Sequence, residues 1–124
     1  MSMSIFLVLD LEARECFNAQ RLRGCIEGLP SISNWRESSQ AVLSDTLLFE
    51  CDYEYGNDIT RIVVHKDLRY LTIEGVGEAS LQAALEIQKR YGSDIHAVIA
   101  ESPGKNANLS TVNTVQDLRS KLNL

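Results

Sequence analysis

The feature that most restricts the fold of this chain is a stretch in which apolar and acidic side chains alternate. Odd positions from 47 to 55 carry apolar or aromatic residues, and even positions from 50 to 54 carry acids. Because successive side chains of a β-strand point to opposite faces, this period of two predicts a strand with one core face and one acidic face. The acidic face consists of Glu50, Asp52 and Glu54.

Two further strand patterns follow this stretch. Gly56-Asn57 is a residue pair that favours a two-residue hairpin turn. Residues 59–65 are rich in β-branched side chains, and residues 69–74 alternate between apolar and polar positions. Together these patterns predict a meander of three antiparallel strands over residues 47–74.

A two-residue turn also predicts the register of the hairpin. If Tyr55 pairs with Asp58, the residue numbers of opposing pairs sum to 113. Asp52 then faces Arg61, so at least one of the acids can form a cross-strand ion pair.

The remaining elements follow from apolar periodicity and from residues typical of helix ends. Residues 4–9 are apolar at almost every position, which predicts a central strand that is buried on both faces. Residues 31–40 are predicted to be a polar connection or an irregular edge segment, and residues 102–113 are predicted to be a polar loop. The other predicted elements are a helix that starts after Asp10 and ends at Gly28, a helix at 78–91, a strand at 95–100 and a short helix opened by the capping pattern Thr114 to Asp117.

The predicted order is therefore β-α-β-β-β-α-β-α, in a single α+β domain over residues 1–124. This order favours a mixed, mainly antiparallel sheet with the helices packed on one face. It resembles the split β-α-β, or ferredoxin-like, arrangement with an added strand and a terminal helix.

Negative charge is concentrated in one part of the chain. There are 12 Lys and Arg residues against 17 Asp and Glu residues, which gives a formal net charge of −5. Residues 41–60 hold five acids and no Lys or Arg, and the rest of the chain balances. An acidic chain is a poor ligand for the phosphates of nucleic acid, so a charged partner is expected to be basic.

The sequence indicates a cytoplasmic protein. The longest apolar run, from Ile5 to Leu9, is far shorter than the roughly 20 residues of a membrane-spanning helix, and no signal peptide is expected. Cys16, Cys25 and Cys51 lack the spacing of zinc ligands or of a disulfide framework. They are expected to be free thiols, and neither a metal nor another cofactor is predicted.

No complete catalytic constellation is present. Cys51 and His65 lie on paired strands, about one diagonal step apart, but no acid is placed to orient the imidazole. Gly75-Val76-Gly77 precedes a helix but lacks the third glycine of a dinucleotide-binding loop, which favours a simple strand-to-helix turn. Enzymatic activity is therefore not expected.

Two interpretations of the acidic residues remain open. They form either a solvated face that maintains solubility and discourages pairing between sheet edges, or a docking surface that accelerates association with a basic partner. On the second interpretation, the partner-binding residues are Asp45, Glu50, Asp52, Glu54, Tyr55 and Asp58.

In size, acidity and lack of catalytic motifs, the whole chain resembles small bacterial immunity proteins, including those of contact-dependent growth inhibition systems. The residues behind the resemblance are the five acids between positions 45 and 58. The resemblance implies a cytoplasmic, non-enzymatic protein that binds and blocks a cognate toxin, often a nuclease with a basic substrate-binding surface. The alternative is a small-ligand or regulatory ferredoxin-like module, dimeric through its sheet, with a cavity between residues 31–40 and 102–113.

Overall fold

The structure is a computed structural model that describes residues 3–37 and 46–124. Its strands form one sheet in the order β2-β3-β4-β5-β1-β6-β7, and neighbouring strands are antiparallel. The strands are β1 Ser4–Val8, β2 Ile32–Glu37, β3 Leu47–Tyr55, β4 Asp58–His65, β5 Tyr70–Glu74, β6 His96–Ile99 and β7 Ser102–Asn108. The helices are α1 Ala19–Glu27, α2 Glu78–Tyr91 and α3 Val115–Lys121, with a 3₁₀ turn at Leu109–Thr111.

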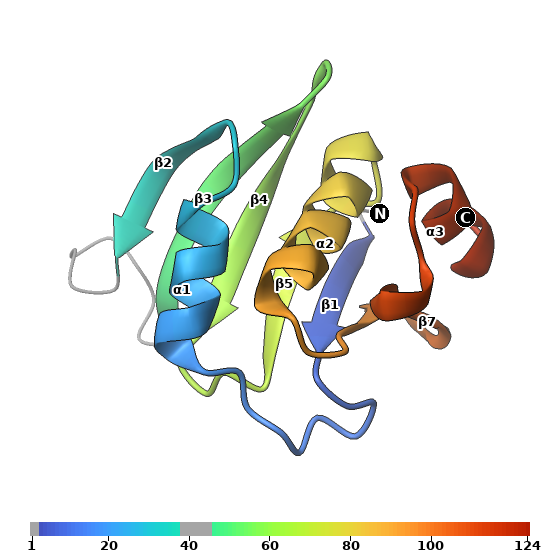
Figure 1. The fold of residues 1–124 in the computed structure, drawn as a ribbon, viewed down its shortest axis with the longest axis horizontal. Coiled ribbons are helices and arrows are strands. Elements are labelled where there is room, and N and C mark those ends of the chain that lie inside the picture. The colour runs from blue at the N-terminus through green and yellow to red at the C-terminus, as the bar shows by residue number, and fades with distance from the viewer. Residues whose placement is uncertain (1–2, 38–45) are drawn as a thin grey trace.

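The helices gather on one side of the sheet (Figure 1). α2 packs on β3, β4 and β5, α1 packs beside α2, and α3 packs against α2 and β7. The hydrophobic core lies between this helix layer and the sheet. The predicted α+β class with helices on one face is therefore confirmed. None of the helices in the described part of the chain is long and apolar enough to cross a membrane.

The central strands have the ferredoxin-like arrangement. β4, β5, β1 and β6 lie side by side in that order, so β1 and β4 run parallel with β5 between them. α1 lies in the connection from β1 to β4, and α2 connects β5 to β6. The added strand predicted at 47–55 is β3, and β2 and β7 extend the sheet further at its two edges.

β1 is central, as predicted, because it lies between β5 and β6. Ile5 and Leu7 are fully buried beneath the helices. Phe6 lies on the opposite face and is only half-buried, because the described helices all lie on one side of the sheet. The expectation that this strand is buried on both faces is therefore wrong for Phe6.

The two edge strands lie in polar segments for which no regular strand was predicted. β2 lies within residues 31–40, and its Trp35 ring stacks on the Phe49 ring of β3 at a centroid distance of 4.6 Å. β7 lies within residues 102–113 and contains Pro103, which an edge strand tolerates because one side of its backbone needs no partner. For residues 31–40 the edge-segment alternative is the correct one. The loop prediction for residues 102–113 was wrong, because pairing with a neighbour, rather than an apolar pattern of its own, holds an edge strand in place.

The first helix starts at Ala19 rather than directly after Asp10. Short acidic side chains compete with helical hydrogen bonding by binding backbone N–H groups nearby. The Asp10 carboxylate does so here, and accepts hydrogen bonds from the backbone N–H groups of Glu12, Arg14 and Glu15. The side chain of Asn18 caps the helix instead. Cys16, which falls within the predicted helix, lies before the observed one and is exposed.

The register of the β3–β4 hairpin follows the prediction along most of its length. From the turn back to Phe49, opposing residue numbers sum to 113. A β-bulge near Leu48 then shifts the register, so that His65 faces Leu47 instead of Leu48. A counting rule cannot reveal such a bulge, because the extra residue is present on one strand alone.

The ends of α2 and α3 match the predictions. α2 spans Glu78–Tyr91, and Gly92 ends it with a φ of 84°, a left-handed conformation that glycine adopts freely. The side chain of Thr114 accepts a hydrogen bond of 3.0 Å from the backbone N–H of Asp117 and caps α3.

The hairpin supplies the cap of α2. Asp58 Oδ2 accepts a hydrogen bond of 3.0 Å from the backbone N–H of Ala79, which places a carboxylate at the positive end of the helix dipole. A Cβ atom at Gly77 would lie 2.5 Å from the same oxygen, so glycine is required for this close approach. The Gly75-Val76-Gly77 segment is therefore a strand-to-helix turn that accommodates an acid of the same chain.

Replacing Asp58 with Ala should remove this cap and lower the free energy of unfolding by about 0.5–2 kcal/mol. Urea unfolding followed by circular dichroism measures the change. Glu54→Ala is the matched control, because Glu54 is an exposed acid on the same hairpin, and it should leave the unfolding midpoint unchanged. Equal midpoints for the two variants would contradict the cap.

Candidate functional site

The predicted acids of β3 lie on the helix-free face of the sheet. Phe49, Cys51 and Tyr53 alternate with them and are buried against the helices. The apolar and acidic faces are therefore the ones that the period of two predicted. The three acids differ, however, in their exposure to solvent and in how far basic side chains offset their charge.

Glu50 is covered rather than solvated. It is 7% exposed, and its Oε1 atom lies 3.1 Å from the Nε atom of Arg36 on β2. The Arg36 Nε–H group has no hydrogen-bond partner of suitable geometry within the described residues, so the contact is ionic. Because a guanidinium group offsets its charge, Glu50 contributes little to the field that steers a distant partner.

Asp52 is half-buried and has two partners. It accepts a hydrogen bond of 2.8 Å from the side-chain amide of Asn34, and it lies 3.5 Å from the Nε atom of Arg61, its predicted cross-strand neighbour. The same Nε atom lies 3.9 Å from a carboxylate oxygen of Glu74 on β5. Two acids therefore share one arginine, and part of the negative charge remains.

The hairpin end, defined as residues 54–59, is the most exposed part of the predicted surface. Tyr55 is 42% exposed and Ile59 is 58% exposed, and the exposed Glu54 pairs with Ile59 across the strands. In Figure 1 the hairpin extends past the end of the helix layer. Ile59 was not among the predicted contact residues, although the predicted register already placed it opposite Glu54.

The other predicted contact residues differ from this pair. Asp58 is half-buried and caps α2, so its carboxylate already has a structural role. Asp45 lies outside the described residues. Of the predicted set, Glu54 and Tyr55 are exposed at the hairpin end, on opposite faces of β3 because they are consecutive. Asp52 lies further along the strand on the same face as Glu54.

Cys51 and His65 lie on opposite faces of the sheet and do not form a nucleophile–base pair. Cys51 faces the helices, and burial raises the pKa of its thiol to about 12, so the thiol is protonated at neutral pH. His65 lies on the helix-free face, where its Nε2 atom is 3.0 Å from the Thr72 hydroxyl. Burial lowers the pKa of His65, so the neutral imidazole is favoured.

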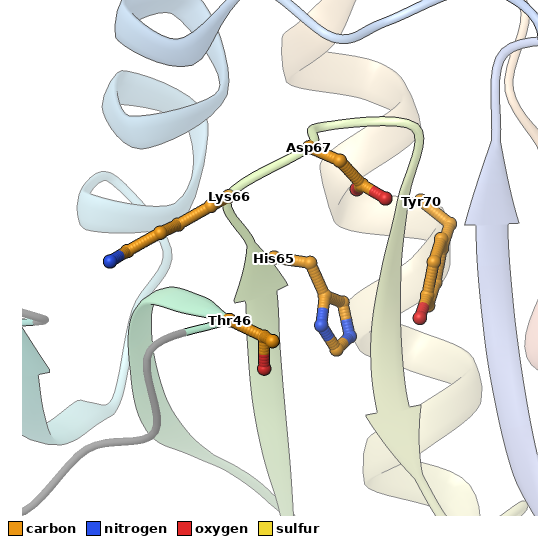
Figure 2. Close-up of a pocket in the computed structure, with 5 residues that line it drawn as sticks. All are labelled: Thr46, His65, Lys66, Asp67 and Tyr70. Carbon is orange, nitrogen blue, oxygen red and sulfur yellow. The ribbon is translucent and has the colours of Figure 1, made fainter.

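A hollow of about 460 Å³ opens beside His65 at the turn between β4 and β5. Figure 2 shows the His65 and Tyr70 rings side by side, with Asp67 at the turn and Lys66 directed away from the rings. The two ring centroids are 4.4 Å apart. In the part of the chain that the structure describes, no group of three His, Cys, Asp or Glu residues could hold a metal ion.

The two segments that were expected to enclose a small-ligand cavity lie far apart. Residues 31–37 contain β2 and residues 102–113 contain β7, and these strands are the opposite edges of the sheet. The predicted position of the cavity is therefore wrong, because both segments extend the sheet instead of crossing it as loops.

Comparison of the chain with family models, curated proteins and solved structures finds no match. Function must therefore be inferred from the described residues themselves. Among these, the hairpin end and the helix-free face are the surfaces that the core does not use.

Replacing Glu50 with Ala should destabilise the fold, because it leaves the half-buried guanidinium of Arg36 without its acid. We expect the free energy of unfolding to fall by about 1–3 kcal/mol, whereas the exposed Glu54→Ala should change it by less than about 0.5 kcal/mol. Urea unfolding of both variants beside the wild type measures the difference. A wild-type midpoint for Glu50→Ala would mean that Glu50 is solvated.

The lowered pKa of His65 predicts that the protein becomes less stable as the pH is lowered through about 6.5. The unfolded chain, with a histidine pKa near 6.5, binds a proton more readily than the folded chain. The free energy of unfolding therefore increases as the pH rises through about 6.5 and decreases as the pH falls below it. His65→Gln should remove this component while keeping a polar group near Thr72. Thermal unfolding between about pH 7.5 and 5.5 compares the two proteins, and identical pH dependences would contradict the prediction.

Proposed function

We propose that this protein is a non-enzymatic inhibitor that binds a basic protein partner, as bacterial immunity proteins bind their toxins. The proposed contact surface is the hairpin end. The observation that carries the proposal is the exposure of Tyr55 and Ile59 beside Glu54, at a point where the hairpin extends past the helices (Figure 1).

The apolar side chains at the hairpin end favour contact with another protein. Four large hydrophobic residues are exposed among the described residues, and Tyr55 and Ile59 are two of them. Tyrosine is enriched among the residues that dominate binding energy at interfaces, because its ring buries a large area while its hydroxyl group keeps a hydrogen bond. Two such side chains within five residues bring no benefit to solubility, so a partner that covers them explains their exposure.

The charge at the hairpin end favours a basic partner. Residues 54–59 contain Glu54 and Asp58 and no basic residue. Asp52 adds further negative charge. Arg61 offsets it only in part, because this arginine is shared with Glu74. A local field of one sign accelerates encounter with a surface of opposite sign and helps to set the orientation of docking.

The proposed surface is narrower than the acidic patch that the sequence predicted. Glu50 is offset by Arg36 and Asp58 caps α2, so substitution of either would change stability together with charge. Glu54, Tyr55 and Ile59 are exposed and can be replaced with little effect on the core. Substitutions at these three positions therefore test binding without a large change in stability.

The proposed partner is a toxin domain, and a nuclease is the activity that suits the charge best. A nuclease presents a basic surface to its substrate phosphates, and an acidic hairpin seated there would exclude the substrate. The proposed compartment is the cytoplasm, where free thiols persist. All three cysteines of the chain are free.

The test starts with affinity capture of binding proteins from source cells on the immobilised wild type and on a Glu54→Lys, Tyr55→Ala, Ile59→Ser triple variant. We expect a basic protein that the wild type retains and the variant does not. With that protein purified, Glu54→Lys alone should reduce the association rate by roughly threefold to tenfold at low salt, and added salt should reduce the wild-type rate. Surface plasmon resonance measures both rates.

Asp94→Lys is the matched control, because Asp94 is an exposed acid in the turn that follows α2, at the opposite end of that helix from the hairpin. This variant makes the same change of charge and should retain the wild-type association rate. A partner whose association rate is unaffected by Glu54→Lys and by salt does not dock at the hairpin end. Inhibition of the captured protein's activity by the wild type completes the test.

A further inference from the structure

A row of aromatic rings crosses the helix-free face of the sheet. Phe6 on β1, Tyr70 on β5 and His65 on β4 lie on neighbouring strands. The ring centroids of His65 and Tyr70 are 4.4 Å apart, and those of Tyr70 and Phe6 are 4.8 Å apart. These distances are typical of aromatic pairs that stabilise one another. The row is therefore held in position before any partner arrives.

An apolar hollow of about 270 Å³ lies at the Phe6 end of this row. Phe6, Val8, Tyr70 and Val98 of the sheet form its floor and Leu11 and Pro103 are further lining residues. Leu11 is 57% exposed. The apolar pattern of β1 thus continues on a face where the described helices provide no cover.

The size of the hollow favours a single side chain over a whole metabolite. Ligand pockets for small molecules commonly measure about 300–1,000 Å³ and enclose most of the ligand, and this hollow lies just below that range. The hollow also shares Tyr70 with the hollow beside His65, and it shares Leu11 with a third hollow along residues 10–15. The three hollows are therefore neighbours on this face, and together we call them the trough; a row of adjacent hollows suits an extended segment better than a compact ligand.

The charge along this trough is negative. Among the residues that line its outer parts, Lys66 and Arg14 are basic. The acids outnumber them and are Asp67, Asp10, Glu12 and Glu15. The formal charge of the lining is therefore −2, and it lies at the end formed by residues 10–15, because Lys66 balances Asp67 at the other end. At the charged end Asp10 also accepts backbone hydrogen bonds and Glu12 pairs with Arg14. This arrangement complements a segment that carries a basic side chain beside an apolar one.

We propose that this trough is a binding site for a basic peptide segment whose single apolar or aromatic side chain enters the hollow formed by Phe6, Tyr70 and Leu11. A lysine or arginine residue next to that anchor faces the acids at the end of the trough formed by residues 10–15. The site is separate from the hairpin end and does not depend on an inhibitory function.

Nitrogen-15 NMR titration of the whole protein with defined peptides tests the site. The probe is N-acetyl-Lys-Trp-Lys-amide, and its controls are the Glu-Trp-Glu peptide, which reverses the charge, and the Lys-Gly-Lys peptide, which lacks the anchor. We expect the first peptide to shift the backbone amide signals of Phe6, Leu11 and Tyr70. The Glu-Trp-Glu peptide should bind at least about threefold more weakly at low salt, and the Lys-Gly-Lys peptide should cause no comparable shifts.

A pair of leucine variants makes the test specific to the trough. Leu11→Ser alters an exposed lining residue of the hollow and should weaken binding of the Lys-Trp-Lys peptide by about threefold or more. Leu124→Ser, at another exposed leucine, should leave it unchanged. Both positions are exposed, so neither variant should disturb the core.

Several results would overturn the proposal. These are the absence of shifts with the Lys-Trp-Lys peptide, equal affinity for the Glu-Trp-Glu peptide, and shifts confined to residues 54–59. Concentration-dependent shifts of the trough without peptide would assign the face to a second copy of the chain, and stronger shifts with oligothymidylate would assign it to single-stranded nucleic acid. Failure here leaves the proposed function standing, because the peptides do not test the hairpin end.

Discussion

Burial on one side of the sheet is the constraint on which the rest of the structure depends. The helices cover one face of the sheet (Figure 1), so each central strand must place apolar side chains at alternate positions. Ile5, Ile62 and Leu71 are fully buried on that face. The other face has no helix to cover it in the described part of the chain, and its side chains must be solvated, paired or covered by another molecule. Solvation, ion pairing and coverage by another molecule therefore apply to different parts of the outer face.

Pairing accounts for the middle of the acidic strand. Glu50 contacts Arg36, and Asp52 shares Arg61 with Glu74. Breaking a covered pair by removing one partner is costly, because the remaining charge has little access to water. Selection for a stable sheet is therefore sufficient to explain these acids. It does not explain the exposed apolar side chains at the hairpin end or the ring row, and these are the features on which the two proposed contacts rest.

Local patterns were predicted well, and long-range pairing was not. The bounds of α2 and the register of the hairpin depend on residues close together in sequence, such as Gly92 and Gly56-Asn57. β2 was predicted only as one alternative, an irregular edge segment, because its ladder with β3 holds it in place. Arg36 lies on β2, so the neutralisation of Glu50 could not be predicted without the pairing of these two strands. The start of α1 was also missed, because the Asp10 carboxylate binds the backbone that a helix would have used.

The two proposed contact regions lie at opposite ends of β4. Ile59 and His65 are six positions apart on this strand, a distance of about 20 Å at roughly 3.3 Å per residue. The network of Asp52, Arg61 and Glu74 lies between them. A single partner that covered both ends would place this network at the centre of its interface, where removal of water from charged groups costs most. Separate contacts at the two ends leave the network solvated, so the geometry favours two independent binding regions over one continuous interface.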